Sequence, residues 1–404
     1  MKTITILGTG NRAQVYTNEL GALFPKQFTV THLFGRNQKN NQEFQKKYNI
    51  PQANIKNDYK EFLETTERLS DIVFITTPDD GHYEPIKHAI KMGYDVLIEK
   101  PIGMSLEEIE DLETLKVSDN QITAVCYVLR HSPMFNKIKE VLDSVTLGKV
   151  VDIQHNENIG YYFFAHNFVR GIWKNIKDSA PLIVAKSCHD VDILTYLTDS
   201  EGMKLSSFGG LTHFTKDNFN SKTMAKRCVD CSLKFTCPYS ALEIYKEERP
   251  GVATFHNNVD LEKSDYGKCV YYSNNNTNDH QVSIIEFKNG VKSTMNVSAF
   301  TPDVNRSSKI MCTHGEIKAN ELDDHIVVTQ FGKESKRIPY ARGERGHGGA
   351  DEKFVYEFGK SVLERKPFEP SLKTAIHSHR LAYLLEESSK KGGHLYNYED
   401  VKSR

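Results

Sequence analysis

The sequence lacks any apolar run close to the roughly 20 residues that a membrane-spanning helix needs, so we expect no membrane partner. It also lacks an excess of one charge, because its 404 residues have a formal net charge of -1 and no long basic block. This balance argues against nucleic acid or an anionic surface as the main partner. The apolar run in "MKTITILGTG" is too short for a signal peptide, so we expect a cytoplasmic protein.

Disulfides are a further expected absence. The chain has seven cysteines, which cannot all pair within one chain, and cytosolic thiols stay reduced. A length of 404 residues is too great for one average domain, so we predict two.

The first predicted strand runs into a glycine-rich turn, "TITILGTGNRAQVYTNEL", in which Gly8, Gly10 and Ala13 form G-x-G-x-x-A. The first glycine permits a tight turn, the second lets a pyrophosphate approach the backbone, and the small third residue allows close packing. The free N–H groups of the following helix would face the anion. Alone the motif is weak, because glycine turns precede many helices.

The surrounding pattern strengthens this interpretation. The segments "FTVTHLFG", "SDIVFITTP" and "DVLIEKP" are predicted strands, and "NNQEFQKKY" and "HYEPIKHAIKMG" have helical spacing. Such alternation predicts an α/β fold with a parallel, doubly wound sheet. We therefore predict that residues 1–125 form a dinucleotide-binding Rossmann domain.

The end of the second strand bears on the choice between NAD and NADP. An acidic residue usually binds the ribose 2′-hydroxyl of NAD there, but this chain has Gly35, followed by Arg36 and Asn37. Arg36 would suit a 2′-phosphate, or it is an ordinary exposed turn residue. Both cofactors stay open.

A more specific signal lies in "VFITTPDDGHYEPIKHAIKMGYDVLIEKP". The matching elements are Thr77-Pro78, His82 and Glu99-Lys100-Pro101. With them the chain resembles the Gfo/Idh/MocA oxidoreductases, the family of glucose–fructose oxidoreductase and inositol dehydrogenase, and the likeness continues through "YVLRHSP", "LGKVVDIQH" and "GHGGADEKFV". The resemblance implies a second α/β domain with a large open, mainly antiparallel sheet, a sugar-like or cyclitol substrate, and a homodimer or homotetramer.

Residues 126–404 support this architecture independently. After residue 150 the predicted strands alternate apolar and polar residues and are joined by turns such as "KNG" and "THGE", which is typical of antiparallel meanders. We predict a substrate-binding and oligomerisation domain over 126–404, with a cysteine-rich insertion near 215–270.

Lys100 is the first catalytic candidate. Oxidation of a secondary alcohol needs a base for the hydroxyl proton, and the nicotinamide takes the hydride. Lys100 follows a parallel strand, at the end of the sheet where ligands bind, and the resemblance assigns it to the catalytic centre. The alternative is a surface lysine before a proline turn. The predicted cofactor contacts are Gly8, Gly10, Asn11, Arg12, Arg36, Thr77, Pro78, His82, Glu99 and Lys100.

The segment "LIVAKSCHDVDILTYL" predicts a helix with a second catalytic candidate. Ser187 can cap it, His189 lies in its first turn, and Asp192 follows one turn later, where it would orient the substrate or the histidine. The resembled family has a histidine here and an aspartate four residues earlier, where this chain has Ala185. Lys186 is the nearest polar substitute, so we count it with the catalytic candidates.

Residues 155–175, "HNENIGYYFFAHNFVRGIWKN", mix aromatic and hydrogen-bonding side chains, which together suit a polyhydroxylated ligand. They precede the His189 helix, as the substrate segments of the resembled family do. We predict substrate contacts from His166, Arg170 and Trp173, of which Arg170 would suit a carboxylate or phosphate. The alternative is a surface loop with a few buried aromatic residues.

The segment "RCVDCSLKFTC" holds Cys228, Cys231 and Cys237. C-x2-C is typical of zinc knuckles, and a metal would stabilise a polar segment that buries little core. The fourth ligand is open among Cys269, Cys188 and His213, and resemblance to a subgroup with "SCHD" and "CVY" segments favours the two cysteines. We predict structural zinc on Cys228, Cys231, Cys237 and Cys269. The alternative is three reduced thiols in a loop.

Together these features predict an NAD(P)-dependent oxidoreductase that acts on a secondary alcohol or ketone of a sugar, cyclitol or derivative. One alternative is a lyase or hydrolase that oxidises its substrate transiently with retained NAD. Another is a non-catalytic nucleotide or sugar sensor, against which the presence of Lys100 and His189 argues.

Overall fold

A computed structural model describes residues 1–249, 251–252, 259–341, 343 and 346–402. Contacts divide the chain into two compact units, each built from three separate segments. The first unit contains Met1–Lys139, Val191–Tyr196 and Tyr340–Arg380, and the second contains Glu140–Asp190, Leu197–Pro339 and Leu381–Arg404.

The first unit is built on a six-stranded sheet with the order β3-β2-β1-β4-β5-β6. The strands are β1 (Lys2–Leu7), β2 (Phe28–Phe34), β3 (Ile55–Lys56), β4 (Ile72–Ile75), β5 (Asp95–Ile98) and β6 (Thr123–Val125). Every neighbouring pair is parallel. This order is that of a doubly wound dinucleotide-binding sheet, which confirms the predicted fold of the N-terminal region.

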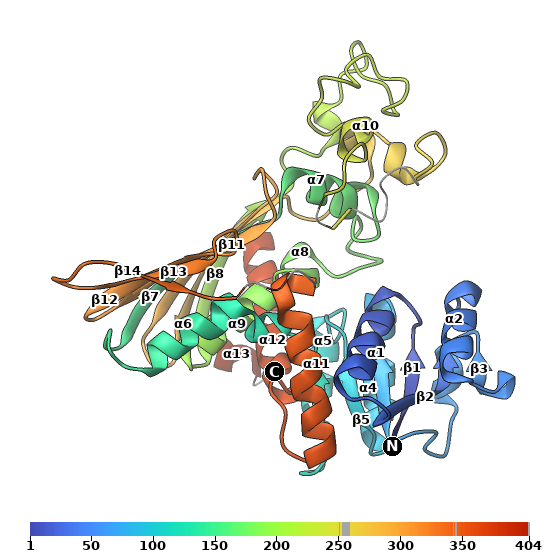
Figure 1. The fold of residues 1–404 in the computed structure, drawn as a ribbon. Helices are drawn as coiled ribbons and strands as arrows, with labels where there is room; N and C mark the ends of the chain where they lie inside the picture. The colour runs from blue at the N-terminus through green and yellow to red at the C-terminus, as the bar shows by residue number, and fades with distance from the viewer. Residues whose placement is uncertain (250, 253–258, 342, 344–345, 403–404) are drawn as a thin grey trace. The chain divides into compact units, whose positions relative to one another are not determined.

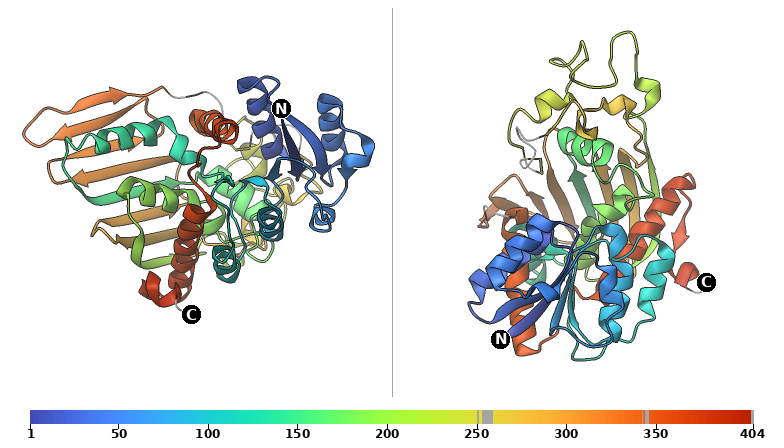
Figure 2. Two further views of the ribbon diagram at one scale, coloured as in Figure 1. Left: turned by 90° about the horizontal axis from the view of Figure 1, so that it is seen from below. Right: turned by 90° about the vertical axis from the view of Figure 1, so that its right-hand side faces the viewer.

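Helices cover both faces of this sheet (Figure 2). On one face lie α1 (Asn11–Leu23), α2 (Gln38–Tyr48) and α11 (Gly346–Glu364), which share a core with Ile4 and Ile6 of β1. Tyr16 of α1 and Phe358 of α11 both belong to this core. The helix α4 (Tyr83–Lys91) contacts β4 and β5 and also α5 (Leu106–Glu113). A segment more than 300 residues along the chain thus completes the core around β1.

The second unit contains a nine-stranded sheet with the order β14-β13-β12-β11-β7-β10-β9-β8-β15 (Figure 1). Its strands are β7 (Val150–Asn158), β8 (Gly202–Gly210), β9 (His280–Phe287), β10 (Lys292–Ser298), β11 (Asn305–Cys312), β12 (Gly315–Asn320), β13 (His325–Gln330), β14 (Lys336–Pro339) and β15 (Tyr396–Asn397). The β7–β10 pair is parallel and the other neighbouring pairs of this sheet are antiparallel, so the predicted mainly antiparallel sheet is confirmed.

Residues on β9 and β10 alternate between buried and more exposed positions, as expected for a sheet covered on one face. The more exposed positions include Val282 and Ile284 of β9. The remaining helices are α3 (Lys60–Leu63), α6 (Pro133–Asp143), α7 (Tyr161–Phe164), α8 (Leu182–Ala185), α9 (Cys188–Thr198), α10 (Ala241–Ile244), α12 (Leu372–Lys390) and α13 (Tyr398–Lys402).

We call the described residues of 211–279, between β8 and β9, the cysteine lobe. Its helix α10 lies near α7, which comes earlier in the chain (Figure 1). Within residues 211–240 only Phe214, Cys228 and Ser240 are buried, so this part has little apolar core of its own. In the described part of the chain, no helix combines the length and apolarity that crossing a bilayer demands.

Candidate functional site

The turn between β1 and α1 has the geometry that a bound pyrophosphate requires. Gly8 has a φ of +85°, and a Cβ there would lie 2.5 Å from the Thr76 carbonyl oxygen, so a side chain cannot be accommodated. A Cβ on Gly10 would meet nothing within 4 Å, which leaves the space in front of α1 open. Asn11 begins the helix and is exposed. The helix N-terminus is therefore accessible to an anion.

Arg12, predicted to contact the cofactor, is engaged within the fold. Its Nε lies 2.7 Å from a Glu99 oxygen, and its Nη2 lies 2.9 Å from a carboxylate oxygen of Asp351 on α11. Tyr16 also donates to Glu99, at 2.5 Å. Burial alone would raise the pKa of Glu99, but Arg12 and Lys100 outweigh it and hold that pKa below its usual range. Arg12 and Glu99 therefore anchor the end of β5 to α1 and α11.

Lys100 is partly exposed directly after β5, and the residues that follow it are held by two buried histidines. His82 bridges the carbonyl oxygens of Pro101 and Thr77 with its two ring nitrogens, at 2.6 and 2.8 Å. The backbone N–H of Ile102 donates to His379 Nε2 over 3.2 Å. His82 thus positions the Lys100 loop, while Thr77 lies buried and Pro78 exposed at the end of β4.

The end of β2 offers no carboxylate at the position where an NAD ribose is usually bound. A Cβ on Gly35 would lie 2.5 Å from Thr9 Oγ1 and 2.9 Å from Asn41 Oδ1, so these side chains occupy the space. Arg36 follows as an exposed residue, and Asn37 caps α2 by accepting a hydrogen bond from the Asn40 N–H. Arg36 is therefore accessible to a ligand at this strand end.

His131 gives this unit a predicted dependence on pH. Its ring is buried between Phe354 and Phe368, and burial, then Lys353 and Arg130, lowers its pKa to about 4, although a backbone hydrogen bond at Glu369 opposes this. The unfolded chain, with a pKa near 6.5, binds the proton first, so stability falls as the pH drops from about 6.5 towards 4.

We expect the free energy of unfolding of wild type to fall in that window, because His131 contributes up to about 1.4 kcal/mol per pH unit. In His131→Phe the slope of unfolding free energy against pH, measured by urea titration, should be smaller by that amount. An unchanged slope would contradict the buried, neutral histidine. The aromatic replacement preserves the stacking on Phe368, so the slopes can be compared even if absolute stability differs.

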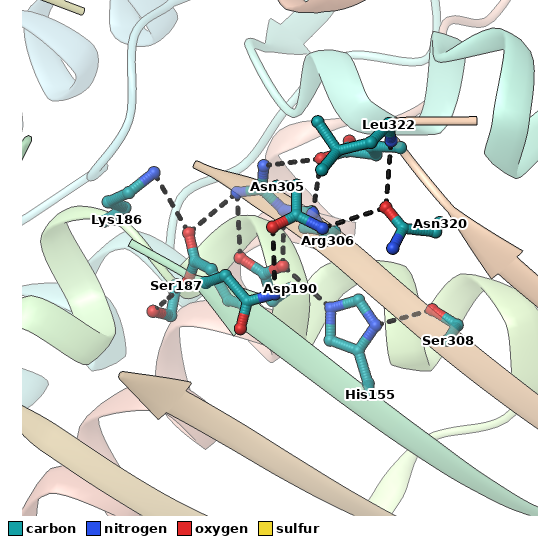
Figure 3. A network of polar contacts seen from close by, with 12 residues as sticks. His155, Lys186, Ser187, Asp190, Asn305, Arg306, Ser308, Asn320 and Leu322 are labelled. Atoms are coloured by element: carbon teal, nitrogen blue, oxygen red, sulfur yellow. Dashed lines mark hydrogen bonds and ion pairs between the residues drawn. The ribbon is translucent and has the colours of Figure 1, made fainter. Parts of the chain in front are cut away.

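In the second unit, a buried polar network joins β7, β11 and the start of α9 (Figure 3). Arg306 of β11 lies 2.6 Å from Asp190 and 2.8 Å from Glu157, and both carboxylates are at least 99% buried. His155 of β7 contacts Asp190 at 2.8 Å and Ser308 at the same distance. The network connects the sheet to the helix that carries His189, which is itself buried.

The carboxylates of this network are tuned in opposite directions. Burial, followed by the charge of Asp190, raises the pKa of Glu157, although Lys186 and Arg306 partly oppose this. Burial would also raise the pKa of Asp190, but Arg306 and His155 outweigh the effect of burial and hold this pKa well below its usual range. Such a pair separates one firmly ionised carboxylate from one that accepts a proton more readily.

Lys186 contacts the Glu157 side of this network (Figure 3). Its Nζ lies 3.1 Å from Glu157 Oε1 and 5.0 Å from the Phe163 ring centroid, and the side chain is 16% exposed. Ser187, predicted as a helix cap, donates its hydroxyl to the other Glu157 oxygen. Lys186 therefore combines a buried carboxylate partner with access to solvent.

Asp192, predicted to orient the substrate or His189, is committed to another partner. Its buried carboxylate accepts two hydrogen bonds from Arg130, at 2.7 and 2.8 Å, and one from Ser378 at 3.0 Å. All three residues belong to the first unit. The Asp192 side chain thus forms a buried ion pair with Arg130.

The predicted substrate contacts of the 155–175 segment lie largely inside the second unit. His166 is buried, hydrogen-bonds Tyr245 at 2.8 Å and stacks on Tyr266, and burial lowers its pKa to about 4. Trp173 is partly exposed and stacks on Phe168. Arg170 is only 1% exposed and lines a cavity together with cysteines. His166 and Arg170 are therefore used in packing the interior.

That cavity has a volume of about 30 Å³ and lies in the cysteine lobe. Its lining includes Cys228, Cys231, Cys237 and Cys269. All are free thiols, and nowhere in the described ranges do three or more histidine, cysteine or acidic side chains already have the arrangement of metal ligands. The other predicted fourth ligands lie elsewhere, since Cys188 is buried at the start of α9 and His213 contacts Tyr271 at 3.0 Å.

Comparison with known proteins gives concordant results. Residues 2–127 match the model of the oxidoreductase family with an NAD-binding Rossmann fold, Gfo/Idh/MocA. The chain is 24% identical over 392 residues to YteT of Bacillus subtilis (strain 168), a protein with an oxidoreductase name, and the match covers 90% of each chain. It is 29% identical over 139 residues to scyllo-inositol 2-dehydrogenase (NAD(+)) of the same strain, covering 34% of this chain and 38% of the relative.

Among solved structures, levoglucosan dehydrogenase in complex with NADH has the same fold. It superposes with a TM-score of 0.73 at 15% identity, and the match covers 98% of both chains. This likeness shows that the fold is shared over nearly the whole length of both chains. Residues 2–127 therefore match the NAD-binding Rossmann fold of the Gfo/Idh/MocA oxidoreductases, and over most of its length the chain is similar in sequence to an oxidoreductase and in fold to a solved dehydrogenase.

Proposed function

We propose that the protein is an NAD(P)-dependent dehydrogenase or reductase that interconverts a secondary alcohol and a ketone on a sugar, a cyclitol or a related polyol. The observation that carries this proposal is the partly exposed Lys100 at the carboxyl end of β5, in a parallel sheet whose glycine turn leaves Gly10 open. Ligands of open parallel sheets bind at that end of the strands. The names of the inositol and levoglucosan dehydrogenases support the substrate class.

In this proposal the Gly8–Gly10 turn and the start of α1 hold the pyrophosphate, and the nicotinamide supplies or accepts the hydride. Lys100 takes the hydroxyl proton during oxidation and returns it during reduction. The clamp of His82 and His379 on the residues after Lys100 supports this role, because it fixes the backbone from which the Lys100 side chain extends. A fixed backbone reduces the freedom that positioning the group would otherwise cost.

We further propose that His189 and Lys186 contact the substrate from the second unit. Lys186 is paired with Glu157, whose raised pKa makes it the readier of the two network carboxylates to accept a proton. The Lys186–Glu157 pair can therefore donate a hydrogen bond to a substrate oxygen while Lys100 takes the proton. It stands in the region where the resembled family has its aspartate, and it offers a cation instead.

The test is to incubate the purified protein with NAD or NADP and a panel of cyclitols, anhydrosugars and aldoses, following the near-ultraviolet absorbance of the reduced nicotinamide. Net reduction of the cofactor together with a ketone product supports the proposal. Turnover of substrate without a net absorbance change would contradict the dehydrogenase and favour a lyase or hydrolase that oxidises its substrate transiently. Tight cofactor binding without turnover of any polyol in the panel would favour the sensor.

Arg36 provides a prediction about the choice of cofactor. Since Arg36 is exposed beside a strand end with no carboxylate, a 2′-phosphate would gain one charged contact from it. We expect Arg36→Glu to lower the ratio of kcat/KM for NADPH to kcat/KM for NADH by about tenfold or more, since 1.4 kcal/mol corresponds to a factor of ten. Steady-state kinetics with both cofactors measures the ratio. An unchanged ratio would show that Arg36 does not face the 2′-position.

A further inference from the structure

Arg170 is a buried cation, and the described part of the chain places no carboxylate beside it. Its Nε donates to the Lys268 carbonyl at 2.8 Å and its Nη2 to the Tyr239 carbonyl at 2.7 Å, while Nη1 has no hydrogen-bond partner. Within the described ranges, no carboxylate forms an ion pair with Arg170. A buried guanidinium without an opposite charge is strongly unfavourable, so its surroundings require negative charge.

The nearest source of that charge is the group of cysteines. Nη2 of Arg170 lies 3.5 Å from Cys228 Sγ, and the backbone N–H of Ala241 donates to the same sulfur at 3.4 Å. Two N–H donors therefore reach this one sulfur. Cys228 Sγ also lies 3.8 Å from the Lys268 carbonyl oxygen.

The backbone brings the four cysteines to one cavity. Cys228 N–H donates to Gly267 and Cys269 N–H donates to Lys226, both at 2.9 Å, on either side of the antiparallel bridge between Arg227 and Lys268. Cys269 lies opposite Lys226, which is two residues from Cys228, and such positions on a two-stranded ribbon point to the same side. Both cysteines therefore face the cavity that Cys231 and Cys237 also line. This arrangement selects Cys269 over Cys188 and His213 as the fourth member.

We infer that Cys228, Cys231, Cys237 and Cys269 bind one zinc ion as a closed tetrathiolate site, and that Arg170 is its buried counter-charge. The four thiols line one cavity but do not have the arrangement of metal ligands in the described structure, so binding requires that their side chains change rotamer. Each thiol loses its proton to solvent when the metal binds, and the resulting complex is an anion beside Arg170. Four protein ligands leave no open position, so the site stabilises the cysteine lobe and takes no part in hydride transfer.

The first test is the zinc content of full-length protein purified without chelators. We expect roughly one zinc per chain, as for a closed four-ligand site. Cys231→Ser and Cys237→Ser should lose it, whereas Cys312→Ser, which changes a buried free thiol of β11 outside the cavity, should keep it. Protein without zinc, protein with iron in its place, or full retention in both cavity variants would overturn the inference.

The second test does not depend on the folding of a variant. Exchange of the metal for cobalt should produce thiolate-to-cobalt absorption bands, and four thiols of wild-type protein should react with a thiol reagent only after a chelator is added. A disulfide between two of these cysteines in the freshly purified protein would contradict the proposed zinc site. Neither readout depends on turnover, so the proposed dehydrogenase activity stands or falls separately.

The counter-charge has its own measurement. We expect Arg170→Gln to weaken zinc binding by about 10–100-fold in competition with a chelating dye, the usual cost of losing a hydrogen-bond donor to a metal ligand. Arg249→Gln is the matched control, because Arg249 carries the same charge in the same lobe but does not line the cavity. Equal zinc affinities of the two variants would show that Arg170 does not stabilise the bound zinc.

Discussion

Replacement of Lys100 by methionine is expected to lower kcat/KM by roughly 10²–10⁴-fold, the usual contribution of a positioned proton-transfer group. Methionine keeps the length and apolar stem of the side chain but can neither accept nor donate the substrate proton. The fold should tolerate the change, because Arg12 continues to neutralise Glu99 at 2.7 Å and His82 still holds Pro101. Steady-state kinetics with the best substrate of the polyol panel measures the loss.

Two controls separate chemistry from binding. Lys91→Met removes an exposed lysine of the same unit, at the end of α4, and should leave kcat/KM unchanged. The affinity of Lys100→Met for the reduced cofactor, followed by nicotinamide fluorescence, should change little. If Lys100→Met kept full activity, the assignment of the proton-transfer group to Lys100 would be wrong. A loss of cofactor binding equal to the loss of rate would instead make Lys100 a binding residue.

Replacement of Arg306 by methionine is expected to have the largest effect on stability, about 3–5 kcal/mol, because it leaves buried charges without their partner. Arg306 lies between Glu157 and Asp190, whose side chains are 1% and 0% exposed. With the guanidinium removed, Glu157 retains Lys186 and Asp190 retains His155, but neither replaces the shared cation. Urea denaturation followed by the fluorescence of Trp173, the single tryptophan and part of the same unit, measures the loss.

A second substitution tests the electrostatic cause. Glu157→Gln added to Arg306→Met removes one of the two stranded charges and should recover part of the lost stability, whereas a packing defect would not be repaired. Arg337→Met, which changes an exposed arginine of β14, should cost less than about 0.5 kcal/mol. A loss in Arg306→Met no greater than that of Arg337→Met would contradict the description of the network as a charge-balanced core.

The fold of the first unit was predictable because its information is local. Strand and helix patterns alternate through "SDIVFITTP" and "DVLIEKP", and the sheet order follows from the doubly wound connection rule. The return of α11 to this unit was not predictable in the same way. Phe354 and Phe358 have a helical spacing that would suit any core, and nothing local indicates which sheet they cover.

The candidate site was predictable where chemistry follows a turn or a strand end, as at Gly8, Gly10 and Lys100. It was not predictable where function depends on burial. Arg170 and His166 look like ligand-binding side chains in the sequence, yet both are interior. His155 and Glu157 alternate with Ile153 on the buried side of β7, and this period of two, with charged residues at apolar positions, was the available signal for the network. Self-association as a homodimer or homotetramer stays a prediction.

The packing of α11 against α1 and β4 has a consequence for synthesis of the chain on the ribosome. Proteins emerge from the N-terminus, and β1 and α1 are made long before Phe354 and Phe358. At about 5–20 residues per second, roughly 10–50 s pass between the release of β6 and that of α11. Throughout that interval Tyr16, Phe24 and Phe74 lack the aromatic side chains of α11 that they contact in the folded unit. The nascent chain therefore carries apolar surface that favours aggregation until α11 is made, and a chain whose translation stops within the nine-stranded sheet has an N-terminal unit that still lacks this helix.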